Sequence, residues 1–169
     1  MKRLLLDTCI YGEMILDKEL TALKETHNSE VQMYGFILIR RELRATSPTK
    51  RYLGKNVRVA MLSLYDQFVG EKNLLVDEST LMLTAKKYFD TYRQLGGHLS
   101  EKELQTDYLI VACAAHKSMD VVASNDHASM LSELSLKAYS IVNDALKLKN
   151  PHFIDYAQFK LLLLGGTLR

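Results

Sequence analysis

Acidic residues recur at one kind of place in this sequence, beside a buried apolar segment. The first of them, Asp7, follows the run Leu4-Leu5-Leu6, which predicts a strand over residues 2–6. A carboxylate at the tip of a buried strand costs free energy unless a partner stabilises it. Three later acids have comparable settings, namely Glu42, Asp107 and Asp126. Their placement predicts that four carboxylates form one site.

The expected chemistry of such a site is that of a divalent cation. The carboxyl ends of parallel strands meet at one edge of a sheet, so these acids should lie close together. Like charges at short range cannot all stay ionised without a counter-charge. Hard oxygen donors of this kind favour Mg²⁺ or Mn²⁺. We therefore expect Asp7, Asp107 and Asp126 to bind the ion, with Asp7 bridging, and Glu42 to reach it directly or through water.

Each acid taken alone has a plainer explanation. Asp107 lies near a predicted helix start, where a carboxylate complements the helix dipole. Glu42 stands among arginines and could form a surface ion pair. Asp126 could cap the helix that follows it. Glu103, four residues before Asp107, is either a fifth acid at the rim of the site or a solvated glutamate in the first turn of its helix.

Composition indicates one soluble globular domain. The 169 residues are 47% hydrophobic and 25% charged, which is ordinary for a domain that buries a core without disulfides. We expect a single domain over residues 1–169, with residues 144–169 an extension of uncertain role. Two distant cysteines, no signal peptide and no apolar run long enough to cross a membrane predict a cytoplasmic protein without a membrane partner.

Predicted strands alternate with predicted helices along the chain. That alternation predicts an α/β fold whose central parallel sheet of about five strands is covered on both faces. We expect a polar connection at 26–29 and a helix around Glu42 that ends at 46–49. The tail after Pro151 is expected to end in a short helix. A second strand is expected within residues 31–39, centred on 34–39, and the other expected strands are 73–76, 119–123 and 138–142. The other expected helices are 11–24, 57–69, 80–94, 101–117 and 127–136.

Positive charge gathers around Glu42. Residues 40–58 hold seven lysines and arginines against one acid, a local charge of +6 in a chain of net charge +2. Such a concentration suits a surface that binds phosphates beside the acidic site. The alternative is a solvated helix face. The candidate nucleic-acid contacts are Arg40, Arg41, Arg44, Lys50 and Arg51.

Four short motifs, in this order and spacing, resemble the PIN-domain family over about residues 2–143. They are Leu-Leu-Leu-Asp-Thr ending at residue 8, Ile-Arg-Arg-Glu-Leu at 39–43, Thr-Asp-Tyr-Leu-Ile-Val-Ala at 106–112 and Val-Val-Ala-Ser-Asn-Asp at 121–126. The resemblance implies a three-layer α/β/α sandwich and a metal-dependent ribonuclease site built from the four acids. It also implies that Ser124 is a hydroxyl residue beside the last acid.

Many members of that family are VapC-like toxins of toxin–antitoxin pairs, and members commonly self-associate. The resemblance therefore implies an RNA substrate, an antitoxin partner and a homo-oligomer, dimeric or higher. The chain departs from the family pattern at Cys9, where many members have asparagine. We expect Thr8 and Ser124 to hydrogen-bond to the metal ligands.

The predicted activity is hydrolysis of RNA phosphodiester bonds, because a bound Mg²⁺ or Mn²⁺ polarises a phosphoryl oxygen and activates water. A phosphatase with an aspartyl nucleophile would often place a second acid at position 9, where this chain has cysteine. A third possibility stays open: a catalytically silent PIN-like scaffold that binds RNA or protein in RNA processing.

Overall fold

The computed structural model describes residues 1–19 and 30–166, and these residues surround a four-stranded parallel sheet. The strands are β1 (Lys2–Leu6), β2 (Val31–Tyr34), β5 (Val121–Ala123) and β6 (His152–Ile154), and they lie in the order β2-β1-β5-β6. Leu4, Leu5 and Leu6 on the central strand β1 are fully buried, as expected where both faces of a parallel sheet are covered. The predicted α/β fold is confirmed, with four strands in the described part of the chain.

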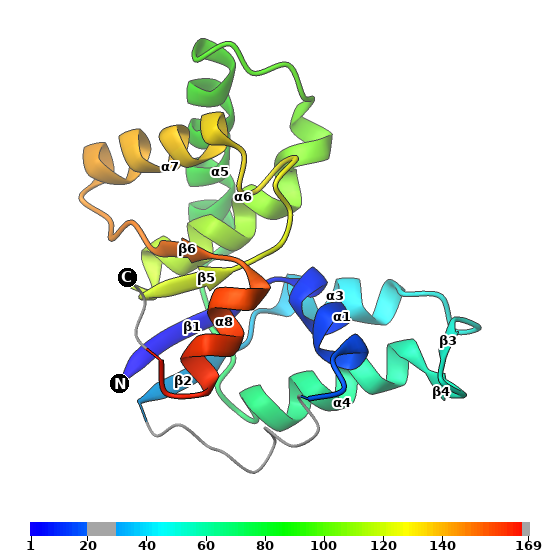
Figure 1. Ribbon diagram of the computed structural model, residues 1–169. Helices are drawn as coiled ribbons and strands as arrows, with labels where there is room; N and C mark the ends of the chain where they lie inside the picture. The colour runs from blue at the N-terminus through cyan, green and yellow to red at the C-terminus, as the bar shows by residue number, and fades with distance from the viewer. Residues whose placement is uncertain (20–29, 167–169) are drawn as a thin grey trace.

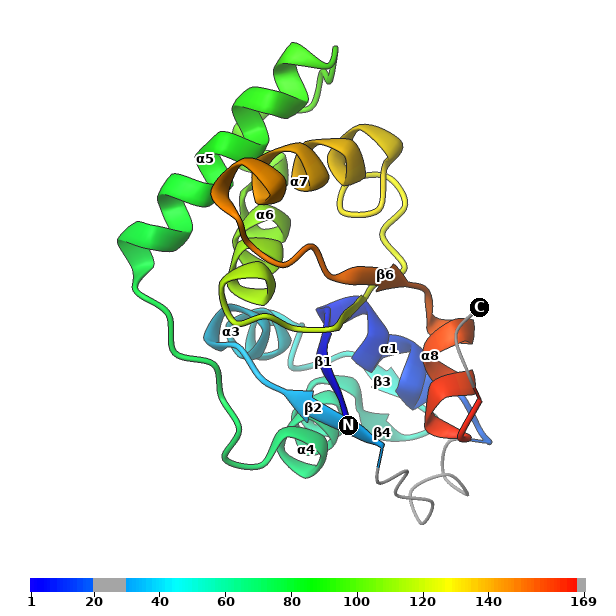
Figure 2. The same cartoon turned by 90° about the vertical axis from the view of Figure 1, so that its left-hand side faces the viewer.

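Helices cover the sheet on two sides. Figures 1 and 2 both place α5, α6 and α7 above the sheet and α4 beneath it, and α8 lies beside α1. Lys160 on α8 forms an ion pair with Asp17, which ends α1. The described helices are α1 (Thr8–Leu16), α3 (Ile37–Ala45), α4 (Val57–Val69), α5 (Glu78–Gln94), α6 (Glu101–His116), α7 (Glu133–Leu146) and α8 (Tyr156–Leu163). None of these helices is long and apolar enough to cross a membrane.

A small hairpin of β3 (Arg51–Tyr52) and β4 (Lys55–Asn56) joins α3 to α4 and lies at the right-hand end of Figure 1, away from the sheet. Its two-residue turn has positive φ at both positions, +47° at Leu53 and +77° at Gly54. Positive φ at both central residues is the geometry that two-residue hairpins prefer. Leu53 is 73% exposed at the tip.

The strand predicted within residues 31–39 is confirmed as β2, but it is not centred on 34–39 as expected. The strand ends at Tyr34, and α3 begins at Ile37. One apolar run thus spans the end of a strand and the start of a helix, and a short apolar run does not distinguish the two. Within α3, Ile39 and Leu43 face the core at a spacing of four residues, which is a helical period.

The predicted strand over 138–142 is wrong, because these residues lie within α7. The buried residues of α7 are Ser135, Ala138, Tyr139, Val142 and Asn143, a helical spacing. The fourth strand of the sheet is instead β6 in the tail, paired with β5. Residues 127–132, predicted as helix, form turns before α7 begins.

The other predicted helices and strands agree with the structure closely or in part. The helix predicted at 57–69 is confirmed, and that at 101–117 ends one residue early. At 73–76 the sheet gains only a single bridge, between Gly35 and Asn73. The helix predicted at 11–24 is observed as α1 up to Leu16, and the connection predicted at 26–29 lies outside the described residues.

Tyrosines supply much of the buried aromatic surface. Between α5, α6 and α7, the rings of Tyr88, Tyr108 and Tyr139 pack edge to face, with centroids 5.0–5.9 Å apart. A buried phenol needs a hydrogen-bond partner. The Tyr88 hydroxyl donates to Asn143 Oδ1 at 2.6 Å, whereas the buried Tyr11 hydroxyl has no partner among the described residues.

The same substitution at these two tyrosines should therefore change stability in opposite directions. Tyr88→Phe leaves the fully buried Asn143 carbonyl unsatisfied and should lower the free energy of unfolding by about 1–2 kcal/mol. Tyr11→Phe removes an unpaired buried hydroxyl and should raise it by about 1 kcal/mol. Urea unfolding followed by circular dichroism measures both, and a loss of stability in Tyr11→Phe would contradict the assignment.

Candidate metal centre

The structure places Asp7 at the carboxyl end of β1, as the N-cap of α1. The side chain is 5% exposed. Its Oδ1 accepts hydrogen bonds from the Thr8 backbone N–H at 2.7 Å and from Thr8 Oγ1 at 3.1 Å. Its N–H donates to the Ala123 carbonyl on β5 at 2.9 Å. The end of β1 thus fixes the backbone of Asp7 against β5, and Thr8 orients its carboxylate.

Glu42 lies in the second turn of α3 and faces Asp7. Thr8 Oγ1 is 3.0 Å from Glu42 Oε2 and 3.1 Å from Asp7 Oδ1. A hydroxyl carries a single hydrogen, so it can donate to only one of the two carboxylates at a time. Asp7 and Glu42, 35 residues apart in the chain, therefore form a pair that shares one donor.

Asp107 and Asp126 form a second pair of the same kind. Ser129 Oγ hydrogen-bonds to Asp107 Oδ2 and lies 2.7 Å from Asp126 Oδ2. Asp107 is in the second turn of α6, and Asp126 lies in the loop that follows β5. Here too, a single hydroxyl hydrogen must serve two carboxylates. The acids of the site can therefore accept more hydrogen bonds than the neighbouring groups donate.

Two further side chains fix the other oxygen of Asp7. Ser124 Oγ, fully buried, donates to Asp7 Oδ2 at 2.8 Å and accepts from the Asp126 N–H at 3.0 Å. The Cys9 thiol donates to the same oxygen at 3.1 Å and accepts from the Asn125 N–H at 3.1 Å. Burial raises the pKa of Cys9 to about 12, so it remains a neutral thiol donor. Both side chains connect Asp7 to the loop after β5.

The electrostatics of the site disfavour four ionised carboxylates. Burial, with Asp7, Asp126 and Glu42 nearby, raises the pKa of Asp107 to about 7, although the Ser129 hydrogen bond opposes the rise. Burial, and then the charge of Asp7, also raises the pKa of Glu42, against the lowering effect of Thr8. At neutral pH Asp107 therefore holds a proton for part of the time, which a cation could replace.

The ligand set fits Mg²⁺ or Mn²⁺ in kind, because it consists of carboxylate oxygens. Among the described residues, Glu42 and Asp107 each accept a hydrogen bond from one hydroxyl alone. In the described part of the chain, however, no group of three acidic, histidine or cysteine side chains is close enough to hold one ion. Mg²⁺ commonly binds one or two carboxylates and keeps several waters, so either pair is a suitable anchor. The three-acid ligand set of Asp7, Asp107 and Asp126 remains a prediction.

The plainer explanations of the acids apply only in part. Glu103 forms the capping box of α6 with Ser100 and is exposed, so it is a first-turn glutamate. Asp107 is not in that first turn. Asp126 does cap its local turn, accepting from the N–H groups of Ala128 and Ser129 at 3.0 Å each. Glu42 takes part in none of the ion pairs found between described residues.

Among the candidate nucleic-acid contacts, Arg40 differs from the others. It forms an ion pair with Asp66 at 2.8 Å and lies over the ring of Tyr65, so it ties α3 to α4. The remaining four are exposed, and none forms an ion pair with another described residue: Arg41, Arg44, Lys50 and Arg51. Their charges are available to a phosphate-bearing partner.

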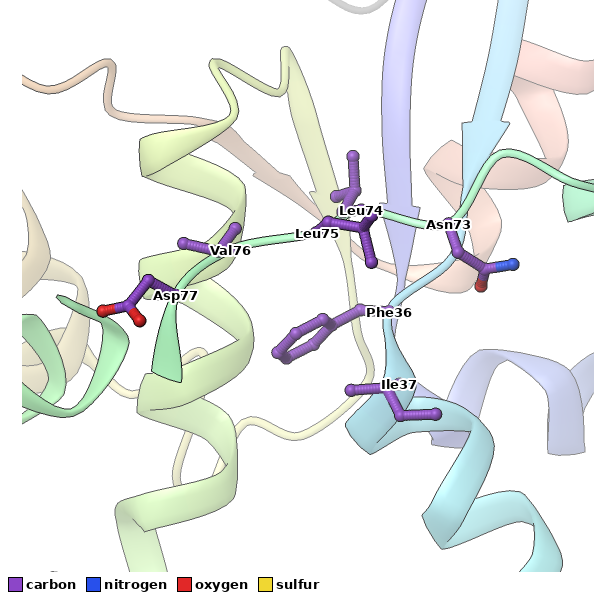
Figure 3. Close-up of a pocket in the computed structure, with 7 residues that line it drawn as sticks. All are labelled: Phe36, Ile37, Asn73, Leu74, Leu75, Val76 and Asp77. Carbon is purple, nitrogen blue, oxygen red and sulfur yellow. The ribbon is translucent and has the colours of Figure 1, made fainter. Parts of the chain in front are cut away.

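A separate pocket lies beside the linker between α4 and α5. Figure 3 shows its lining, which consists of Phe36, Ile37 and residues 73–77 around a volume of about 450 Å³. Its only carboxylate, Asp77, caps α5 by accepting from the Thr80 N–H at 3.0 Å. None of the four acids of the candidate site lines this pocket, so it is not part of the metal centre.

Sequence reasoning missed Ser129 and undervalued Cys9. Ser129 follows Asp126 by three residues, the spacing at which an aspartate caps a turn, so the motif was visible. Its contact with Asp107, 22 residues earlier, was not visible. Cys9 was noted only as a departure from the family pattern, and the structure places its thiol on Asp7.

Comparison with known proteins supports the fold. A chain of VapBC-1 from nontypeable Haemophilus influenzae matches with a TM-score of 0.54 at 15% identity, covering 92% of this chain and 98% of that one. FitAcB from Neisseria gonorrhoeae matches with a TM-score of 0.54 at 16% identity, covering 91% and 98%. VapBC2 from Rickettsia felis, bound to a DNA fragment from its promoter, matches with a TM-score of 0.53 at 11% identity, covering 90% and 98%.

No protein-family model and no curated protein matches the sequence. At such low identities the structural matches show the fold alone. The resemblance to the PIN-domain family, and the α/β sandwich that it implies, are confirmed at that level.

Proposed function

We propose that this chain is a Mg²⁺- or Mn²⁺-dependent endoribonuclease and the toxin of a toxin–antitoxin pair. One observation carries the proposal: the two carboxylate pairs, Asp7 with Glu42 and Asp107 with Asp126, each share a single hydroxyl. Such a site has an excess of negative oxygen donors. A divalent cation is the partner that this arrangement best accommodates.

Asp7, Asp107 and Asp126 would hold the ion, and Glu42 would contact it directly or through water. When bound, the ion supplies Lewis-acid polarisation of a phosphoryl oxygen and activates a water molecule. Thr8, Ser124 and Cys9 keep the carboxylates of the first pair oriented by the hydrogen bonds described above. Because all these donors are neutral, they orient the acids without cancelling the charge that attracts the cation.

RNA is the proposed substrate because exposed cations lie close in sequence to Glu42. Arg41 and Arg44 flank it on α3, and Lys50 and Arg51 follow on the segment that leads into the β3–β4 hairpin. These groups can neutralise phosphates on either side of the cleaved bond. The resemblance to VapC-like proteins supports an antitoxin partner and self-association. The two distant cysteines support a cytoplasmic location.

Metal dependence provides the test. The full-length protein, freed of metal with EDTA and dialysed, should not cleave a labelled single-stranded RNA. Addition of Mn²⁺ or Mg²⁺ should restore cleavage, with a DNA of the same sequence as the control substrate. Products are resolved on a denaturing gel. RNA binding without cleavage at any concentration of either ion would overturn the proposal and favour the silent PIN-like scaffold.

A further inference from the structure

Contacts on both sides of Ser129 in the chain hold its backbone in place. Its N–H donates to Asp126 Oδ1 at 3.0 Å, within the turn that Asp126 caps. The next residue, Met130, is fully buried in the core, and the Ser132 N–H donates to the Ser129 carbonyl at 3.2 Å. The backbone of Ser129 is therefore fixed by the loop and does not depend on the contact of its hydroxyl with Asp107.

Within the described part of the chain, Ser129 is the one hydrogen-bond partner of the Asp107 side chain. The segments that carry Asp107 and Asp126 belong to different elements, and their like charges repel. Ser129 Oγ reaches both carboxylates at once. Removing this hydroxyl would leave the half-buried Asp107 facing acids alone, with nothing to hold its carboxylate toward Asp126.

We propose that Ser129 is a positioning residue, which aligns the carboxylates of Asp107 and Asp126 so that one divalent cation can bind between them. The inference rests on the proposed function, because it concerns the same ion. Ser129 acts through the two acids and is not itself a ligand. Partners of this kind, which orient metal ligands, typically contribute a factor of 10–100 to metal affinity.

The chain offers a matched control for the test. Ser132, three residues further on, is another hydroxyl of the same loop, and it caps α7 by accepting from the Ser135 N–H at 3.3 Å. It contacts Ser135 and none of the four acids. Ser132→Ala should therefore lower the stability of the fold without changing the affinity for the ion.

Mn²⁺ affinity, measured by isothermal titration calorimetry on the full-length protein, is the primary measurement. Ser129→Ala should weaken Mn²⁺ binding by about tenfold or more, whereas Ser129→Thr, which keeps the hydroxyl, should bind within about threefold of wild type. Ser132→Ala should match wild type within about twofold. The rise in melting temperature on adding Mn²⁺ provides a second readout, and it should be smaller in Ser129→Ala alone.

The results of these measurements distinguish the positioning role of Ser129 from the proposed nuclease function. If wild type binds Mn²⁺ and a folded Ser129→Ala binds it equally well, the positioning role is wrong while the nuclease proposal stands. If Ser129→Ala and Ser132→Ala weaken binding to the same extent, the effect is one of general loop stability, and the role is again wrong. If wild type does not bind Mn²⁺, the proposed function fails and the inference fails with it.

Discussion

Asp7→Asn should lower the rate of metal-dependent RNA cleavage by at least about 10³-fold. Asparagine has the same shape but no charge, so the variant would lose the buried anion on which the proposed cation and its activated water would depend. Loss of several kcal/mol of transition-state stabilisation corresponds to a factor of this size. The fold should persist, because removing one of several like charges offsets the altered hydrogen bonds to Ser124 and Cys9.

Glu103→Gln is the matched control for this experiment. Glu103 is an exposed acid near the start of α6, and glutamine can keep the capping box with Ser100. Its cleavage rate should stay within about twofold of wild type. Rates are measured under single-turnover conditions with saturating Mn²⁺, and folding is checked by circular dichroism. An Asp7→Asn variant with a rate near that of wild type would exclude Asp7 from the site.

Gly35→Ala should lower the free energy of unfolding by about 2–3 kcal/mol. Gly35 joins β2 to α3, and an added Cβ would lie 2.1 Å from Tyr65 Oη, 2.6 Å from Asn73 Oδ1 and 2.7 Å from Val69 Cγ1. Tyr65 is buried, and its hydroxyl donates to Asn73 Oδ1 at 2.8 Å. The methyl group must displace that ring and break the hydrogen bond, which is overpacking of a closed core.

Gly12→Ala provides the same chemical change without the obstruction. Gly12 lies inside α1, and a Cβ there would meet no atom within 4 Å. Alanine in a helix interior is favoured over glycine by about 0.5–1 kcal/mol, so this variant should be more stable than wild type. Urea unfolding, fitted with a common dependence of the unfolding free energy on urea concentration, compares the stabilities of the two variants. Equal stabilities for Gly35→Ala and wild type would show that Gly35 has room for a side chain.

Sequence patterns were reliable where one physical signal dominated. The uninterrupted Leu4-Leu5-Leu6 run could only be buried, and so it identified β1 and the carboxylate at its end. Residues 57–69 carry a helical periodicity over thirteen residues, and α4 has those bounds. Short apolar runs were unreliable, because residues 138–142 suit a strand and a helix equally well until their burial against α5 is known.

The sequence by itself determined that four carboxylates stand beside buried apolar segments and that cations gather near Glu42. Only the tertiary structure decided which acids are partners, pairing Asp7 with Glu42 and Asp107 with Asp126. It also brought Ser129 to Asp107 across 22 residues. The physical reason is that strand ends and helix turns are specified by local periodicity. Contacts between hydroxyls and carboxylates depend on how distant segments pack, which local patterns do not encode.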